Sequence, residues 1–315
     1  MKSESRWTNL IAPLLTLGCL FYFLVFQAYA SGYGYTRYTI WQQMKLGYKM
    51  EQGEWMFGYA VPFIVLGLLW MTRDQFKGVE VKWSWLGVPV LLLAFFCYFG
   101  GYKANQKYIG YGAMHLMIGG AVIWHFGLKV FLKGLWLYIL LGMMWPWIFL
   151  IDKISLPLQK IMTTLTAGVM TLLQEDFIKE GTMIRSAPTE DLIAGERFSL
   201  AVAAACSGLR SFFALAMISL LYGYITLKKD VNRLILFLSS GVFAIAGNLV
   251  RMMLLYWGTL LWGKEFAIGR GEHDPSHYHI GAGLAVFVVA LIGMVSLSAF
   301  LERKKNRKVV RKTQG

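Results

Sequence analysis

A cysteine, an arginine and a histidine in the C-terminal half of this 315-residue chain are residue types that perform nucleophilic chemistry. Cys206 lies within the apolar run "AVAAACSGLRSFFALAMISLLYGYI", Arg251 within "GNLVRMMLLY", and His279 directly before "IGAGLAVF". A thiolate is a strong nucleophile, and nearby positive charge increases the fraction of thiolate near neutral pH. Histidine can transfer protons, and arginine can bind a carboxylate or a developing oxyanion. Together the three residue types could perform acyl transfer through a thioester.

The spacing of these residues predicts that they lie at one level of a membrane. Cys206 and Arg210 are four residues apart, and Asn248 and Arg251 are three apart, so each pair shares one face of a helix. At about 1.5 Å per residue, Cys206 and Arg251 both reach the outer boundary of the hydrocarbon core. Small residues in two of the helices are expected to let the backbones approach closely. These are Ala201, Ala205 and Gly208, and Gly281 and Gly283.

The elements that position these residues must be membrane helices, because 57% of the chain is hydrophobic and only 15% is charged. A bilayer core needs roughly 20 apolar residues per helix. The sequence predicts an all-α integral membrane protein, a polytopic bundle of about eight transmembrane helices. Their expected ranges are about 10–30, 55–71, 84–101, 108–127, 134–151, 198–225, 234–262 and 280–301. The first run ends in "AYA", but it is long enough to be retained as a membrane anchor.

One further helix is expected to lie in the membrane interface rather than to cross it. In "ISLPLQKIMTTLTAGVMTLLQ" the apolar residues recur at helical spacing on one side. Their positions are Leu158, Ile161, Met162, Leu165, Val169, Met170, Leu172 and Leu173. The opposite side carries Gln159, Lys160, Thr163, Thr164 and Thr166. An amphipathic helix of this kind rests on the outer surface of the bilayer.

Three regions follow from this organisation. Residues 1–133 form a transmembrane scaffold of four helices, 134–302 a catalytic membrane domain, and 303–315 a basic tail. With the N-terminus inside, the short cytoplasmic segments carry 17 of the 31 Lys and Arg residues, so both termini are expected in the cytoplasm. The tail is expected to touch anionic membrane lipid, and no nucleic acid partner is expected.

The other cysteines and histidines have simpler interpretations. Cys19 and Cys97 lie in the middle of apolar runs, which favours small packing residues over a disulfide framework. His115 and His125 lie within or at the end of the fourth span, where a hydrogen bond to a neighbouring helix is expected.

Three sequence blocks resemble the signature blocks of the exosortase/archaeosortase family of membrane cysteine transpeptidases. They are "ACSGLRS" at 205–211, "NLVR" at 248–251 and "HIGAGLAVF" at 279–287. The likeness extends over about residues 140–300 and includes "MMWPW" and "DKISLPLQ".

The resemblance implies a role for each of three residues. Cys206 would be the nucleophile that forms the acyl-thioester, Arg251 the proton donor, and His279 the group that stabilises the transition state. Because a guanidinium hardly ever releases its proton, an electrostatic or substrate-holding role suits Arg251 better. His277 precedes Gly281 at the same spacing as His279 precedes Gly283, and only the latter has Phe287 four residues further on.

The resemblance also implies substrates and a location. Family members act on exported proteins that end in a short motif, a membrane helix and a basic tail. They cut near the motif at the outer face of the cytoplasmic membrane and transfer the new C-terminus to an acceptor, expected to be a glycan or a lipid. No cofactor is implied, and neither the motif nor the acceptor can be read from the sequence.

Three other classes of protein are compatible with single features of the sequence. Ser207 with a histidine could form an intramembrane serine protease, although no Gly-x-Ser-x-Gly block is present. A zinc site could use imidazole and carboxylate ligands from "HDPSHYH", which contains His273, Asp274, His277 and His279. A transporter or a surface-assembly factor is the third, but a transporter usually shows repeats and broken helices at the midplane.

Overall fold

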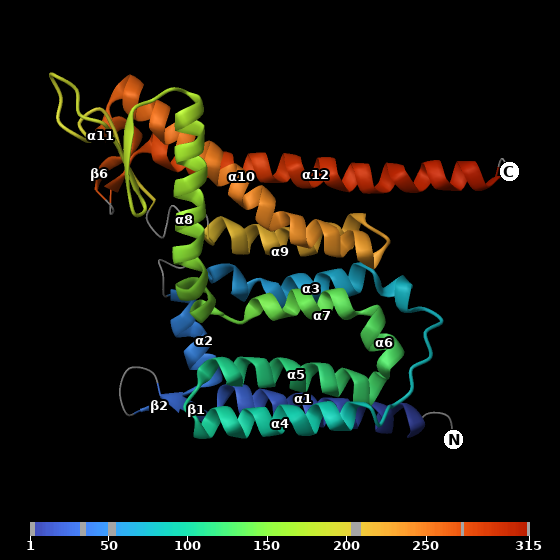
Figure 1. Cartoon of the computed structure of the whole chain (residues 1–315). Coiled ribbons are helices and arrows are strands. Elements are labelled where there is room, and N and C mark those ends of the chain that lie inside the picture. Colours follow the sequence, from blue (N-terminus) through green and yellow to red (C-terminus); the bar gives the residue numbers. More distant parts are fainter. Residues whose placement is uncertain (1–3, 32–35, 50–54, 203–208, 272–273, 314–315) are drawn as a thin grey trace. The chain divides into compact units, whose positions relative to one another are not determined.

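The computed structural model describes residues 4–31, 36–49, 55–202, 209–271 and 274–313 (Figure 1). The chain divides into two compact units, Met1–Trp147 and Ile148–Gly315. Most of each unit is helical, as expected where apolar segments must satisfy their backbone hydrogen bonds without water. α7 (Leu135–Leu141) belongs to the first unit, where it packs against α3 (Val61–Met71).

The first unit consists of helices joined by short turns and one small hairpin. Its further elements are α1 (Glu4–Val25), β1 (Ala28–Ser31), β2 (Arg37–Thr39), α2 (Ile40–Lys49), η2 (Met56–Tyr59), η3 (Arg73–Phe76), α4 (Gly87–Lys103), α5 (Lys107–Phe126), α6 (Leu128–Lys133) and η4 (Gly142–Met144). α4 and α5 lie side by side (Figure 1). Large side chains on the outside of this unit, such as Phe63, Trp70 and Phe96, are exposed, which suits contact with lipid.

Tyr29 of the β1–β2 hairpin anchors that hairpin to α4 and α5. The ring is fully buried, and its hydroxyl donates to the Tyr98 carbonyl oxygen at 3.0 Å. Burial raises the pKa of Tyr29 well above its ordinary value, so the hydroxyl keeps its proton and remains a donor. Gly110 makes room for the ring, because a Cβ there would lie 2.4 Å from Tyr29 Cε1.

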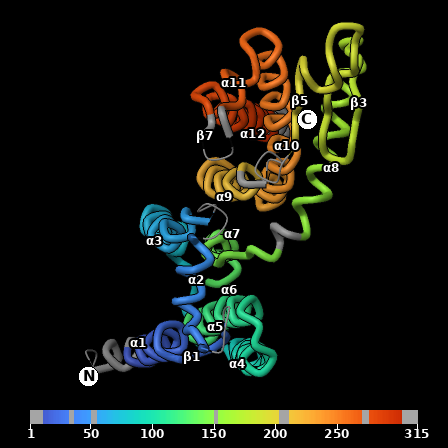
Figure 2. Tube along the Cα trace, turned by 90° about the vertical axis from the view of Figure 1, so that its left-hand side faces the viewer, coloured from blue at the N-terminus to red at the C-terminus, as the bar shows by residue number. Residues whose placement is uncertain are grey.

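The second unit contains the predicted chemistry. Its elements are α8 (Ile148–Leu172), β3 (Phe177–Glu180), β4 (Met183–Ser186), β5 (Ser199–Ala201), α9 (Leu209–Thr226), α10 (Asp230–Trp262), α11 (Lys264–Ala267), β6 (Gly269–Gly271), β7 (Asp274–Pro275) and α12 (His277–Thr313). α10 packs along both α9 and α12, and α8 runs across these three helices (Figure 1). Figure 2 shows β3 and β5 beside α8 and α10. Buried residues of α8, of this sheet and of α10 pack together in one core.

α8 includes the segment expected to form an interfacial helix, and its apolar side is divided between buried and exposed residues: Leu158, Met162 and Met170 are buried. Thr163 and Thr166 are fully buried, whereas Ile161 and Leu172 are exposed. A threonine can be buried in a helix because its hydroxyl can donate to the carbonyl four residues back, as Thr163 does to Gln159 at 2.7 Å. The apolar spacing therefore predicted the helix, and the protein core takes up part of the apolar side together with two threonines.

The expected single helix over 198–225 is wrong, because its first residues form a strand. β5 completes a three-stranded antiparallel sheet with the order β3-β4-β5, and Leu200 is opposite Ile184. Phe198, Leu200 and Val202 are buried and alternate with partly exposed neighbours, which is the period of a strand. Within the described residues, α9 runs over Leu209–Thr226.

Eight membrane-length helices are not established by the structure. Among the described residues, two helices are long and apolar enough to cross a membrane, Asp230–Trp262 and His277–Glu302. Shorter apolar helices occupy much of the other expected spans: Ile11–Val25, Val61–Met71, Gly87–Lys103, Leu135–Met144 and Ser211–Thr226. The expected span over 134–151 is interrupted before Ile148, near Pro146, which lacks a backbone N–H donor.

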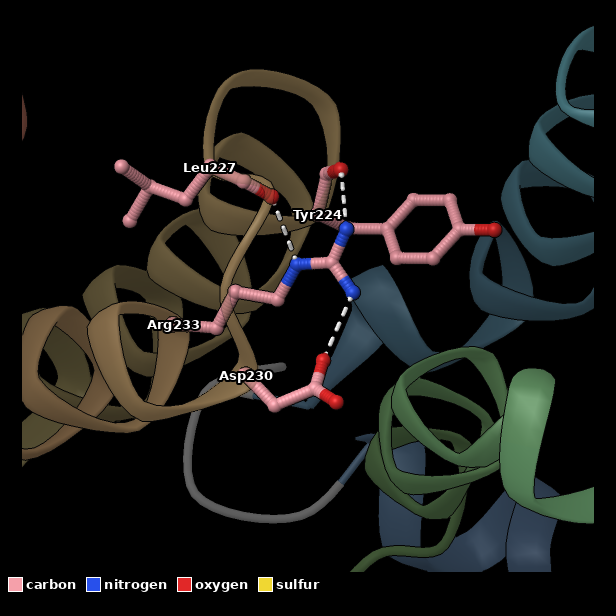
Figure 3. Close-up of polar contacts among 4 residues, drawn as sticks. All are labelled: Tyr224, Leu227, Asp230 and Arg233. Atoms are coloured by element: carbon pink, nitrogen blue, oxygen red, sulfur yellow. Dashed lines mark hydrogen bonds and ion pairs between the residues drawn. The ribbon is translucent and has the colours of Figure 1, made fainter. Parts of the chain in front are cut away.

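The turn between α9 and α10 is held by one arginine (Figure 3). Arg233 Nε donates to the Leu227 carbonyl at 2.8 Å and Arg233 Nη2 donates to the Tyr224 carbonyl at 3.2 Å. Its Nη1 lies 3.1 Å from Asp230 Oδ1. One carbonyl in the last turn of α9 and the first carbonyl after the helix thereby gain donors that the helix itself cannot supply, which fixes the α9–α10 hairpin.

Candidate functional site

Two of the three residues singled out for chemistry lie in direct contact. Arg251, on α10, and His279, in the first turn of α12, are joined by a 2.8 Å hydrogen bond between Nη2 and Nε2. The residues are 28 positions apart in sequence, so the contact depends on the packing of α10 against α12. Asn248, which shares the Arg251 face of α10 as expected, is fully buried.

The contact fixes the proton on the histidine ring. A guanidinium carries only donors, so His279 Nε2 must be the acceptor of the Arg251 N–H. The ring is then neutral, with its proton on Nδ1. His279 in this arrangement presents a donor, not a general base, on the side of the ring away from Arg251.

Two buried nitrogens of this pair have no hydrogen-bond partner within the described part of the chain. They are Arg251 Nε and His279 Nδ1. Buried N–H groups nearly always find an acceptor, because leaving one unpaired costs about 1–3 kcal/mol. The pair therefore offers two donors to an acceptor such as a substrate carbonyl or a thiolate.

The start of α12 distinguishes the two candidate histidines. Ser276 precedes the helix, and its Oγ accepts the His279 backbone N–H at 3.0 Å, which is the geometry of an N-cap. His277, two residues before His279, is exposed, whereas His279 is half-buried against Arg251. The geometry thus favours His279 over His277 for the site.

The third candidate, Cys206, lies outside the described residues, as do Ala205, Ser207 and Gly208. α9 begins at Leu209, three residues after Cys206, and packs against both α10 and α12. The structure therefore does not test the distance from the Cys206 sulfur to Arg251 or His279.

Two of the glycines expected at a close approach, Gly281 and Gly283, have no atom of the described residues within 4 Å of a built Cβ, and Gly208 lies outside those residues. On α10, by contrast, a Cβ at Gly247 would lie 2.7 Å from the Val286 carbonyl oxygen, and one at Gly258 would lie 2.5 Å from Tyr278 Cε1. Ala201, also expected to support helix packing, is an exposed residue of β5. Gly247 and Gly258 thus flank Arg251 on its own helix.

A metal centre receives no support from the described residues. Among them, no three His, Cys, Asp or Glu side chains are grouped so that they could hold a metal ion. His273 of the "HDPSHYH" segment lies outside the described residues. The two described cysteines, Cys19 and Cys97, are free thiols.

Sequence reasoning missed three residues that hold the start of α12, namely Ser276, Tyr278 and Gly258. Tyr278 donates its hydroxyl to the Leu254 carbonyl at 2.8 Å, and Ser276 Oγ donates to the Ala267 carbonyl at 3.2 Å. A serine directly before an apolar helix is a recognisable cap signal. The contact of Tyr278 with Gly258 leaves no local signal, since it depends on how two helices pack.

The helices and the half-buried arginine–histidine pair together define a membrane protein with a polar site where α10 meets the start of α12. Residues 49–296 match the family model of the transmembrane exosortases, and the chain belongs to that family. Members of this family are in general sorting-related cysteine transpeptidases of the membrane. Comparison with curated proteins and with solved structures found no match.

Proposed function

We propose that the chain is a membrane-embedded cysteine transpeptidase that cleaves a C-terminal sorting signal of exported proteins. The observation that carries this proposal is the 2.8 Å contact between Arg251 and His279. Both residues belong to sequence blocks that resemble signature blocks of the family, "NLVR" and "HIGAGLAVF". Family membership supplies the reaction class, and Cys206 is the residue of the family's Cys-Ser-Gly-x-Arg block.

The first half-reaction forms a thioester. The Cys206 thiolate attacks the carbonyl carbon of a peptide bond that precedes the membrane helix of the substrate. The C–S bond forms and the C–N bond breaks. The proton lost by the thiol ends on the amine of the departing C-terminal segment.

The second half-reaction transfers the acyl group to an acceptor. A hydroxyl or amine of a glycan or lipid attacks the thioester, the C–S bond breaks, and the acceptor's proton returns to the sulfur. The arginine–histidine pair acts in both halves, because each passes through a tetrahedral oxyanion. His279 Nδ1–H and the Arg251 guanidinium are donors suited to that negative charge.

This assignment gives Arg251 an electrostatic role in place of proton donation. A guanidinium remains charged in proteins, so it can stabilise an oxyanion without a proton leaving it. The proposed location is the cytoplasmic membrane, with both termini inside and the site at the outer face. The basic tail at 303–315 then contacts anionic lipid on the inner face.

The test is to follow exported proteins that keep a hydrophobic C-terminal segment. In cells that depend on this chain, Cys206→Ala should abolish cleavage, so uncut proteins should accumulate in the membrane fraction and be identified by mass spectrometry. His279→Ala should lower the cleavage rate by about 10²–10³-fold, the usual effect of removing an oxyanion donor.

Two matched controls accompany these variants. His277→Ala removes an exposed imidazole two residues away and should leave cleavage unchanged. Ser207→Ala should also cleave, which separates a thiol from a hydroxyl nucleophile. Normal cleavage by Cys206→Ala would refute the proposed function.

A further inference from the structure

We infer that Tyr278 is a positioning residue that holds His279 against Arg251, and that Gly258 provides the space its ring requires. This inference rests on the proposed function for its catalytic consequence, but its structural content can be tested separately. Tyr278 directly precedes His279, so the position of its side chain sets the position of the first turn of α12.

Tyr278 is held through both its hydroxyl and its ring. Its hydroxyl donates to the Leu254 carbonyl of α10 at 2.8 Å. Its ring lies beside Trp262 and Phe266, with ring centroids 6.0 Å and 5.4 Å away. Aromatic pairs at these separations add stability beyond the burial of their surface.

The residues that receive Tyr278 share one face of α10 with Arg251. Leu254, Gly258 and Trp262 follow Arg251 at intervals of three, four and four residues, which is the spacing of one helix face. A Cβ at Gly258 would stand 2.5 Å from Tyr278 Cε1 and 2.9 Å from Cζ, so no larger residue fits while the ring stays in place. The same face of α10 therefore receives the tyrosine and presents the arginine.

Ser276 adds a second anchor at the beginning of α12. Its Oγ accepts the His279 backbone N–H at 3.0 Å and donates to the Ala267 carbonyl of α11 at 3.2 Å. The His279 backbone is thus held from α11 while the neighbouring side chain is held from α10. Removal of the Tyr278 hydroxyl should loosen the anchor on α10 and leave the Ser276 anchor on α11 intact.

The first experiment measures the histidine itself and needs no substrate. Diethyl pyrocarbonate modifies an imidazole nitrogen that carries a free lone pair, and in His279 the Nε2 lone pair is engaged by Arg251. In purified, detergent-solubilised full-length protein, Tyr278→Phe should increase the rate of His279 modification about three- to tenfold, as expected when one hydrogen bond is lost. The exposed His277 serves as an internal reference, and Tyr222→Phe on α9 is the matched control.

The second experiment tests the predicted coupling between Tyr278 and Gly258. Gly258→Ala should increase His279 modification in the wild-type background, because the added methyl displaces the ring. It should have little effect in a Tyr278→Ala background, where no ring is present to be displaced. Equal effects in the two backgrounds would contradict the inference.

The cleavage assay gives the functional consequence. Tyr278→Phe should lower kcat about three- to tenfold with KM little changed. The groups that bind the substrate remain in place, and only the alignment of His279 with Arg251 is disturbed. Unchanged His279 modification in Tyr278→Phe, or an equal increase at His277, would overturn the positioning role. A selective increase at His279 in a protein that cleaves nothing would uphold the positioning role and refute the proposed function.

Discussion

Arg251 and His279 illustrate how a polar pair is maintained between two apolar helices. Each partner would be costly alone, because an unpaired polar group in such surroundings has no water to bind. Paired, the guanidinium donates and the neutral imidazole accepts at 2.8 Å. The remaining N–H groups of the pair, Arg251 Nε–H and His279 Nδ1–H, are donors. They are suited to stabilising negative charge and not to removing a proton.

Replacement of Arg251 by lysine or glutamine separates charge from shape. Arg251→Lys keeps a positive charge but loses the planar fork that can donate to His279 and to a second acceptor together. We expect cleavage to fall about 10–100-fold in Arg251→Lys and further in Arg251→Gln, which lacks the charge as well. Initial rates of substrate cleavage, measured on protein that elutes as a single species in detergent, provide the comparison.

The control for this pair of variants is Arg185→Gln, which alters a partly exposed arginine of β4 bonded to Met183. Its cleavage rate should match that of the wild type. Wild-type cleavage by Arg251→Lys would show that positive charge alone suffices, and that the fork geometry has no role.

At the scale of elements, apolar runs predicted where helices occur but not where one run changes conformation. Residues 198–225 read as one apolar helix, yet Ser199–Ala201 is a strand and the helix begins at Leu209. A continuous apolar run lacks the polar positions that would reveal its period, so strand and helix cannot be told apart by pattern alone. The polar hairpin at 177–186 has a signal in its sequence, which is the glycine in its turn. Gly181 adopts a positive φ of 59° there, a conformation that glycine adopts readily.

The packing of helices against each other was the least predictable feature. The sequence contains 33 glycines, and their identity alone does not show which ones face a neighbouring helix. Gly281 and Gly283 were expected at an interface and have no close neighbour in the described part of the chain, while Gly247 and Gly258 do. The roles of Arg251 and His279 could be proposed from motifs, whereas Tyr278 required the three-dimensional contact.

The α9–α10 hairpin gives a stability prediction at this scale (Figure 3). The Arg233 side chain is only 11% exposed and donates to two carbonyls at the end of α9, whereas the Asp230 side chain is 75% exposed. Arg233→Ala should therefore destabilise the protein by about 1–3 kcal/mol, because two carbonyls lose their donor. Asp230→Ala should cost less than about 1 kcal/mol, the usual value of an exposed ion pair.

Thermal unfolding in detergent, followed by circular dichroism, compares these two variants directly. The loss should also appear as faster proteolysis near 227–229, the turn that Arg233 holds. If Asp230→Ala proved as destabilising as Arg233→Ala, the ion pair and not the carbonyl bonds would be the source of stability.

At the scale of the whole chain, the second unit has two distinct ends. α8, the three-stranded sheet, α11 and the β6–β7 hairpin gather at the end where α12 begins (Figures 1 and 2). His279, in the first turn of α12, contacts Arg251. The α9–α10 turn lies at the opposite end (Figure 1). The distribution of Lys and Arg predicts that the α9–α10 turn is cytoplasmic, which would place the arginine–histidine pair at the outer face.

This orientation can be tested with topology reporters fused at four positions. Fusions after Leu173 and Gly271, which belong to the end that holds the pair, should be active only for an enzyme that works outside the cytoplasm. Fusions after Lys229 and Arg311 should be active only for a cytoplasmic reporter, because short loops rich in Lys and Arg are retained inside. Replacement of Lys228, Lys229 and Arg233 by glutamine should weaken this preference at the α9–α10 turn. A reporter that placed Lys229 outside would put Arg251 and His279 at the cytoplasmic face, where exported proteins are no longer accessible, and would exclude the proposed reaction.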